Sequence, residues 1–169
     1  MDVMDSGLLL ARVVVGLLMA AHGSQKLFGW FGGYGLAGTG GFFESLGFRP
    51  GRLFAAAAGF TETAGGLLLA LGLLGPLGPA MIISVMVVAM ATVHWQHGVF
   101  AQNNGIELPL VYSVAAVAIA LVGNGGYSLD AALGLSWPAE VVWIALALGV
   151  VGGFANLAVR KTAATEAHV

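Results

Sequence analysis

Long runs of apolar residues, broken by few polar positions, make up most of this chain. Five runs are candidates for membrane-spanning helices, at about 7–26, 53–74, 79–94, 108–122 and 138–159. A helix needs about 20 apolar residues to cross the hydrocarbon core of a bilayer. The fourth run is the shortest of the five candidates. The pattern predicts an all-α integral membrane protein with five transmembrane helices.

The connections between these runs differ in length. The sequence LGPLGP forces a tight turn between the second and third runs, and Pro79 suits the first turn of the third helix. The first connection, at about 29–52, is much longer. Its opening is too glycine-rich to predict a stable helix, whereas FFESLGF predicts one short amphipathic turn in the membrane interface or against the bundle.

The composition agrees with a membrane protein. Only 8% of the residues are charged, 59% are hydrophobic and the mean hydropathy is +0.93. A water-soluble domain has about a quarter charged residues, which excludes an ordinary soluble enzyme. The formal net charge is -2, and no basic run indicates nucleic acid. The chain has no Cys, which excludes thiolate catalysis and an iron–sulfur cluster held by cysteines of this chain.

The basic residues predict the orientation of the chain in the membrane. Apart from Arg12, they lie in the first connection or just after the last span: Lys26, Arg49, Arg52, Arg160 and Lys161. Five spans place both regions on one side, and loops rich in Lys and Arg face the cytoplasm. We therefore expect the N-terminus outside and the C-terminus in the cytoplasm.

Arg12 and Glu62 are each the only charge in the interior of their predicted span. Arg12 lies ten residues before His22, and Glu62 lies ten residues after Arg52, so antiparallel helices would place both at the same depth. An unpaired charge at that depth costs at least about 2.5–3.5 kcal/mol. This predicts an Arg12–Glu62 ion pair. It would either set the register of two helices or form the charged wall of a ligand or proton site.

A second polar set is expected at the cytoplasmic ends of the spans. His22 and Lys26 are four residues apart on one helix face, and His94 ends the third span on the same side. The polar side chains that follow there are Trp95, His97 and Glu107. The alternative is a snorkelling Lys with ordinary interfacial His and Trp. The candidate ligand or quinone pocket consists of Arg12, His22, Lys26, Glu62 and His94.

The spacing of these histidines favours neither a metal nor a haem. Both His22 and His94 lie at an interface, whereas haem ligands are usually buried within spans. No cluster of His and carboxylates has the spacing of metal ligands, so no metal site is predicted. Asp130 follows Ser128 as the first-turn acid of a short capped helix.

Two rows of small residues predict close helix packing. Ala145, Gly149 and Gly153 form a row on the last span, where it could contact a second copy or a partner subunit. The row on the second span is expected to pack within the bundle: Ala55, Gly59 and Thr63.

These segments together resemble the DoxX family of small bacterial membrane proteins. The resemblance rests on ARVVVGLLMAAHGSQKLFGWFGG, GFTETAGGLLLALGL, HWQHGVF and GNGGYSLDAALG, which cover about Ala11 to Gly134. It implies a four-helix transmembrane bundle over residues 1–134 in the bacterial inner membrane. The span within 135–161 is then an additional C-terminal transmembrane helix, followed by a short polar tail at 162–169.

The resemblance also implies a functional context. DoxX-like proteins are described as subunits or partners of membrane-associated oxidoreductase systems, including a thiosulfate:quinone oxidoreductase, and as contributors to redox or sulfur homeostasis. The motif positions carried over to this chain are His22, Lys26, Glu62, His94 and Asp130, with Trp95 in the HW element. Because the chain has no Cys, a thiol-based version of that activity is excluded.

Three functions remain open from the sequence. The first is a quinone-linked redox subunit, in which His or Glu supplies protons and Arg or Lys stabilises an anionic intermediate. The second is a non-catalytic assembly subunit that contacts a homo-oligomer or a partner membrane protein through the Gly149–Gly153 face. The third is a small solute or proton carrier, although no pair of repeated broken helices supports it. Membrane lipid is an expected partner in all three.

Overall fold

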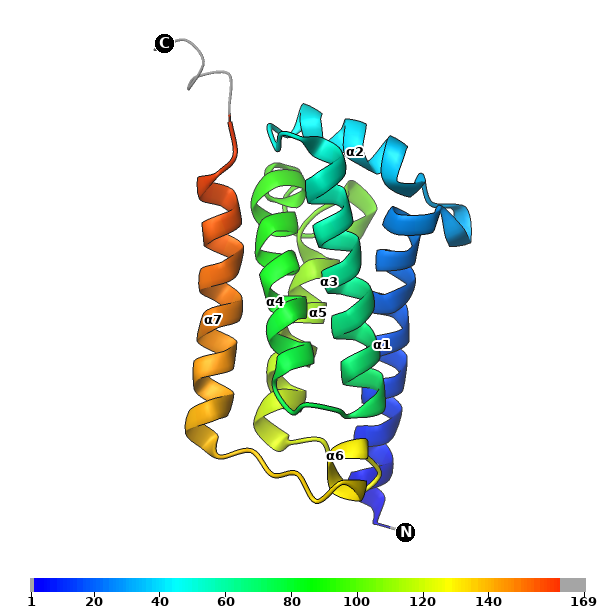
Figure 1. Ribbon diagram of the computed structural model, residues 1–169, viewed down its shortest axis with the longest axis vertical. Helices are drawn as coiled ribbons and strands as arrows, with labels where there is room; N and C mark the ends of the chain where they lie inside the picture. The colour runs from blue at the N-terminus through cyan, green and yellow to red at the C-terminus, as the bar shows by residue number, and fades with distance from the viewer. Residues whose placement is uncertain (1, 162–169) are drawn as a thin grey trace.

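A computed structural model describes residues 2–161, and within that range the ordered elements are all helical. The all-α expectation is confirmed, and the expected tail at 162–169 lies outside the described residues. The α-helices are α1 (Val3–Phe28), α2 (Gly35–Ser45), α3 (Gly51–Leu71), α4 (Leu77–Ala89), α5 (Glu107–Val122), α6 (Leu129–Ala132) and α7 (Ala139–Ala158) (Figure 1). Short helical segments join them: η1 (Trp30–Gly32), η2 (Met90–His94), η3 (Trp95–His97) and η4 (Ala101–Asn103).

Four helices of the described chain are long and apolar enough to cross a membrane, which makes this a multi-pass membrane protein. They are α1, α3, α7 and α4 with its continuation to His97. The fourth predicted span corresponds to α5, which has 16 residues. At 1.5 Å per residue its length is about 24 Å, short of the ~30 Å hydrocarbon core. The shortest apolar run of the sequence therefore gives the one apolar helix that is too short for a full crossing by itself.

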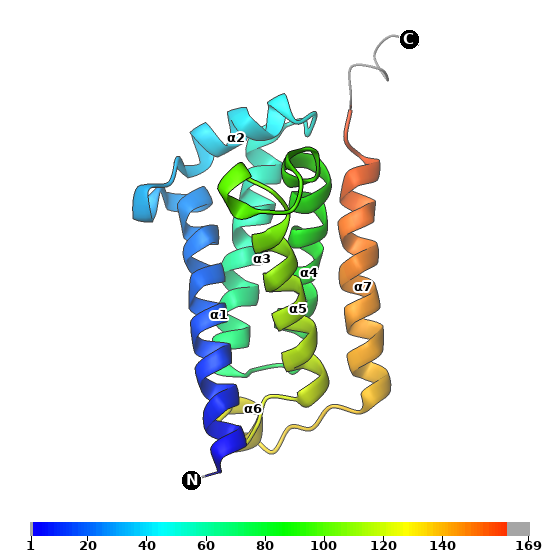
Figure 2. The ribbon, with the colours of Figure 1, turned by 180° about the vertical axis from the view of Figure 1, so that it is seen from behind.

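The long helices form an antiparallel bundle with one helix outside it. α1 packs most extensively on α3, and α4 contacts α3, α5 and α7. α7 stands at the edge of the bundle beside α4 (Figures 1 and 2). The buried core is apolar and comes from all of these helices: Met19, Leu69, Ile82, Ile83, Met86, Ala116, Ile119, Ala120, Val142 and Leu146.

Glycines let α1 and α3 approach closely. A Cβ atom at Gly16 would lie 2.5 Å from the carbonyl oxygen of Gly66, closer than real Cβ contacts. A Cβ atom at Gly23 would meet Gly59 and Thr63 in the same way. The expected packing of the small-residue row of α3 within the bundle is therefore confirmed for Gly59 and Thr63. Close approach matters here because dispersion and close contact hold helices together in lipid.

The small-residue row of α7 also packs within the chain. A Cβ atom at Gly149 would lie 2.5 Å from the carbonyl oxygen of Ala80, and one at Gly153 would meet Val87 and Ser84. The expectation that Ala145, Gly149 and Gly153 contact another subunit is corrected, because both glycines are buried against α4. The outward face of α7 carries large apolar side chains instead: Trp143, Leu148, Val151 and Phe154.

The first connection contains more helix than its glycine content predicts. α2 begins at Gly35 and lies across the end of the bundle (Figures 1 and 2). The expectation of a non-helical opening is therefore wrong from Gly35 onward. The reason is tertiary packing: Thr39 and Gly40 are buried, and Gly40 lies against the backbone and side chain of Arg52 at the start of α3. A larger residue at position 40 would prevent this contact.

Candidate functional site

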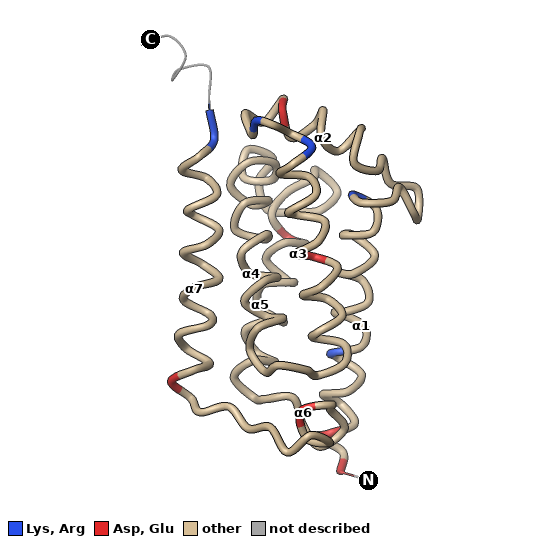
Figure 3. Tube along the Cα trace, viewed as in Figure 1, with Lys and Arg blue, Asp and Glu red and all other residues tan. Residues whose placement is uncertain are grey.

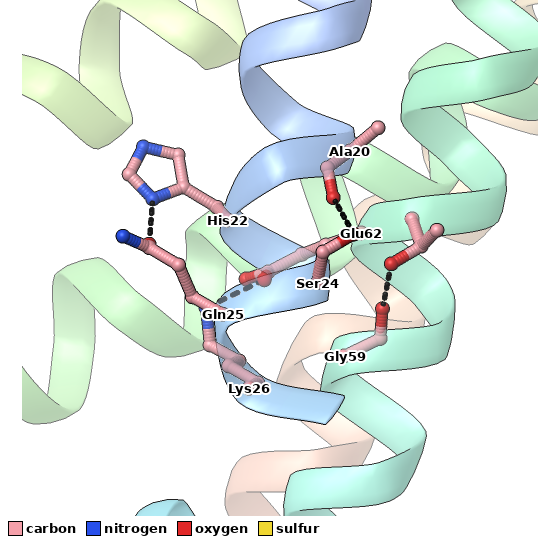
Figure 4. Close-up of polar contacts among 8 residues, drawn as sticks. Ala20, His22, Ser24, Gln25, Lys26, Gly59 and Glu62 are labelled. Carbon is pink, nitrogen blue, oxygen red and sulfur yellow. Dashed lines mark hydrogen bonds and ion pairs between the residues drawn. The ribbon is translucent and has the colours of Figure 1, made fainter. Parts of the chain in front are cut away.

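A buried ion pair joins the first two long helices. Lys26 Nζ donates to Glu62 Oε2 at 2.5 Å (Figure 4). The Glu62 side chain is 6% exposed and the Lys26 side chain 26%. Lys26 comes from the last turn of α1 and Glu62 from the middle of α3. The predicted Arg12–Glu62 pair is thus wrong, and the carboxylate of Glu62 is paired with Lys26.

The error in the predicted pair came from the register of the two helices. The sequence argument counted the depth of Arg12 from His22, whereas α1 continues to Phe28. The observed register places Gly16 opposite Gly66, and Arg12 lies against Gly72. Gly72 is ten residues beyond Glu62 along α3, which is about 15 Å. Arg12 and Glu62 consequently lie at different depths.

A cavity of about 260 Å³ adjoins the ion pair. Its wall is mainly apolar and aromatic, with Lys26, Glu62 and His94 as its ionisable members. Five parts of the fold enclose it: the end of α1, α2 with the α2–α3 loop, α3, α4 with η2, and α7. The main apolar and hydroxyl residues of the wall are Phe42, Phe43, Leu46, Phe48, Phe54, Ala57, Ala58, Thr61, Ser84, Val85, Val88 and Thr92. Three of the five predicted pocket residues therefore share one cavity.

His94 lies where α4 changes its winding. The segment η2 is a π-helix, and such turns inside α-helices are frequent at functional sites. His94 Nδ1 lies 2.7 Å from the carbonyl oxygen of Asn104. A carbonyl can only accept a hydrogen bond, so Nδ1 carries the proton. In the neutral ring Nε2 is then unprotonated and can accept a hydrogen bond or a proton.

His22 does not belong to this cavity. Its ring is exposed, its Nδ1 lies 3.1 Å from Gln25 Oε1, and its edge faces the Tyr112 ring at 6.0 Å between centroids. Figure 4 shows the His22 ring beside Gln25 and set apart from the Lys26–Glu62 pair. Trp95 is 72% exposed and His97 is also exposed. All three side chains are absent from the cavity wall.

Arg12 lies at the opposite end of the bundle, where it is fully buried. Its Nη2 donates to the carbonyl oxygen of Tyr127 at 2.6 Å. Asp130 and Asp5 are the carboxylates that act on the guanidinium electrostatically. No residue within 2–161 forms a hydrogen bond with its Nε or Nη1. Arg12 is thus a buried cation of the α6 end, away from the cavity beside Glu62.

Asp130 ties three segments together at that end. Its carboxylate accepts from the backbone N–H groups of Leu74 and Gly75 and from the side chains of Asn124 and Trp137, each at 2.8 Å. The side chain is buried and lies on α6. The predicted cap is confirmed, since the Ser128 hydroxyl accepts from the N–H of Ala131. Asp130 is therefore saturated with donors from the α3–α4 turn, the α5–α6 loop and the segment before α7.

A second cavity, of about 410 Å³, lies beside Asp130 between α5, α6 and the start of α7. Asp130 is the one ionisable residue in its wall, and its oxygens already accept four hydrogen bonds. This cavity thus offers less chemistry than the cavity beside Lys26 and Glu62. Within residues 2–161, no group of three or more His, Asp or Glu side chains is placed to hold a metal ion.

Two residues of the site were missed by sequence reasoning. Phe48, with 1% of its surface exposed, packs on Phe43 and Phe54 over the cavity. Asn104 lies in the left-handed region at φ 62° and presents its carbonyl oxygen to His94. The left-handed preference of Asn is a weak signal for that turn, whereas no local signal marks Phe48.

The sequence model of the DoxX family matches this chain over residues 7–95. The matched range is more than half of the chain. It contains Lys26, Glu62 and His94 and ends before Asn104, Asp130 and α7. No curated protein and no solved structure matches the chain.

Proposed function

From the premise that this chain belongs to the DoxX family of membrane proteins, which is often linked to oxidoreductase-related systems, we propose that it is a quinone-binding subunit of such a system. The observation that carries this proposal is the cavity whose apolar, aromatic wall contains a buried Lys–Glu ion pair and a histidine. Small-molecule sites have this character, with a few polar groups converging in an apolar pocket. The head of a quinone is an apolar ring with two polar oxygens, which suits such a wall.

The three ionisable side chains supply complementary functions for this ligand. Lys26 keeps donor capacity beyond its bond to Glu62, so it can stabilise negative charge on a quinone oxygen. His94 Nε2 can accept a proton from a quinol hydroxyl, because Nδ1 is held as a donor by Asn104. Glu62 holds the ammonium in position. The chain has no Cys for electron transfer, so the electrons come from a separate donor, a small reductant or a partner redox protein.

His94→Ala is expected to weaken binding of a short-tailed ubiquinone analogue by about tenfold, since one hydrogen bond to the ligand is lost. Titration of the purified protein in nanodiscs, followed by tryptophan fluorescence, measures the dissociation constant. Circular dichroism and size-exclusion chromatography check that the variant folds.

Two other histidines provide matched controls for this experiment. His97 and His22 are both exposed and are absent from the cavity wall. His97→Ala and His22→Ala should therefore bind the analogue as the unmodified protein does. A folded His94→Ala variant with unchanged affinity would remove His94 from the site. Absence of saturable binding by the unmodified protein would refute the quinone proposal and favour a non-catalytic assembly role.

The orientation in the membrane is part of the same proposal. Most of the Lys and Arg residues gather at the end of the bundle where α2 lies and α7 ends, whereas acidic residues lie toward both ends (Figure 3). Loops rich in Lys and Arg remain in the cytoplasm. We place the α2 end, and with it the site, on the cytoplasmic side of a bacterial inner membrane, with the N-terminus outside.

Reporter fusions are expected to place Arg52 and Lys161 on the same side. A phosphatase fused after either residue should be inactive and a fluorescent protein should be bright, because both positions lie at the cytoplasmic end. A phosphatase placed between an added leading span and Asp2 should be active, because the N-terminus is expected outside. Opposite readings for the Arg52 and Lys161 fusions would contradict the proposed topology.

A further inference from the structure

The end of the cavity nearest the aqueous phase is covered. The α2–α3 loop lies over it, with Phe48 almost fully buried beneath. The end of α7 holds this loop from the side: the Arg160 side chain donates to the carbonyl oxygen of Leu46, and the Lys161 N–H donates to that of Gly47 at 2.9 Å. A ligand arriving from water would have to displace this cover.

The side of the cavity is open. Three residues of its wall are exposed, namely Phe42 of α2, Ala57 of α3 and Asn156 of α7, whereas Glu62 and Thr92 are buried. On the long helices, the exposed pair Ala57 and Asn156 marks a mouth between α3 and α7, and the ion pair forms the floor of the cavity. Figure 1 shows α7 set apart from α3, with α4 between them.

This mouth opens beside an exposed, apolar face of α3. Ala57 is six residues after Gly51, the first residue of α3, which is about 9 Å along the helix. On the same helix face, Leu53 is 64% exposed and Phe60 is 65% exposed. Large apolar side chains at this exposure face lipid in a membrane helix. The small side chain of Ala57 thus leaves a gap in a lipid-facing stripe.

The size of the cavity limits what it can hold. Its volume of about 260 Å³ lies below the ~300–1,000 Å³ of pockets that enclose a drug-sized ligand. It can take a ring-sized head but not a head together with a long hydrocarbon tail. A tail attached to a head at the ion pair would leave through the opening beside Ala57.

We propose that the ligand is an isoprenoid- or alkyl-tailed quinone that enters from the bilayer through the gap between α3 and α7. Its head lies at Lys26, Glu62 and His94, and its tail passes Ala57 and Asn156 into the lipid. This inference rests on the proposed function and specifies both the substrate class and the route. The roof formed by the α2–α3 loop stays closed during entry.

Ala57→Trp tests the route, because an indole at that position fills the gap. The variant should bind decyl-tailed ubiquinone at least about tenfold more weakly than the unmodified protein in nanodiscs. Ala118→Trp is the matched control: Ala118 is an exposed alanine on α5, outside the cavity wall, and its variant should bind normally. Normal binding by folded Ala57→Trp, with His94→Ala still impaired, would overturn the route and leave the quinone proposal intact.

Photolabelling of the unmodified protein gives a second measurement that does not depend on the folding of a variant. A quinone with a diazirine at the end of a short tail should label the peptides that contain Phe60 and Asn156. Labelling confined to α2 and the α2–α3 loop would overturn the lateral route. Excess free decyl-tailed ubiquinone should reduce this labelling. If it does not, the result counts against quinone binding itself.

Discussion

Glu62→Leu is expected to destabilise the protein by about 2–3 kcal/mol, because it leaves the partly buried Lys26 ammonium without its counter-ion. Lys26→Met should lower the free energy of unfolding by a similar amount, because it leaves the buried Glu62 carboxylate without its cation. The double variant should cost less than the sum of the two, by a coupling of about 1–3 kcal/mol. Denaturant titration in mixed detergent micelles measures the free energy of unfolding for all four proteins.

Two controls make this cycle specific. Glu140→Leu changes an exposed acid at the start of α7 and should alter the free energy of unfolding by no more than about 0.5 kcal/mol. Arg12→Leu combined with Glu62→Leu should be additive, since the two side chains lie at different levels of the bundle. Coupling between Arg12 and Glu62, and none between Lys26 and Glu62, would contradict the observed pair.

Asp130→Ala is the second change with a large expected effect, a destabilisation of about 3–5 kcal/mol. It removes the acceptor for two backbone N–H groups of the α3–α4 turn and for two side chains. Each donor left unsatisfied out of water costs about 1–3 kcal/mol. Leu74 adds to the loss, because the carboxylate helps to hold its backbone at φ 59°, which a leucine rarely adopts. The same titration in micelles measures the change.

Asp5→Ala serves as the comparison for Asp130→Ala. The Asp5 carboxylate accepts a single bond there, from the N–H of Gly126 at 2.9 Å. Its removal should cost about 1 kcal/mol, the usual net contribution of one hydrogen bond. Equal losses for Asp5→Ala and Asp130→Ala would mean that Asp130 is not the residue that joins the α3–α4 turn to α6. A Leu74→Gly change in the Asp130→Ala background should recover part of the stability, because glycine tolerates positive φ.

The chemistry of the sequence was enough to mark the charged residues within the spans, although it assigned them to one site. A lone charge in an apolar span must find a partner or a polar cavity. The free-energy cost of an unpaired charge in the bilayer was therefore enough to single out Arg12 and Glu62. His94 and Lys26 were predicted to lie near one another because the first and third spans both end at the same membrane face. In the structure Lys26, Glu62 and His94 do line one cavity.

The pairing of those charges was beyond the reach of the sequence. Depth was counted from assumed helix ends, and α1 extends from Val3 to Phe28, beyond both ends of the predicted span. A shift of a few residues along an antiparallel helix changes which side chains meet. The glycines that set the register, Gly16 with Gly66 and Gly23 with Gly59, share a spacing of seven residues in each helix. That spacing is visible in the sequence, but its meaning depends on knowing which helices pack together.

The sequence by itself therefore determined the helical membrane fold, because five long apolar runs with 8% charged residues have no soluble alternative. It also marked the residue types that carry the chemistry. Only the tertiary structure decided that Lys26 is the partner of Glu62, that Gly149 packs on α4 and that the α2–α3 loop covers the cavity. The physical reason is that a span is specified by its own hydropathy, whereas register, cover and cavity depend on contacts between residues far apart in the chain.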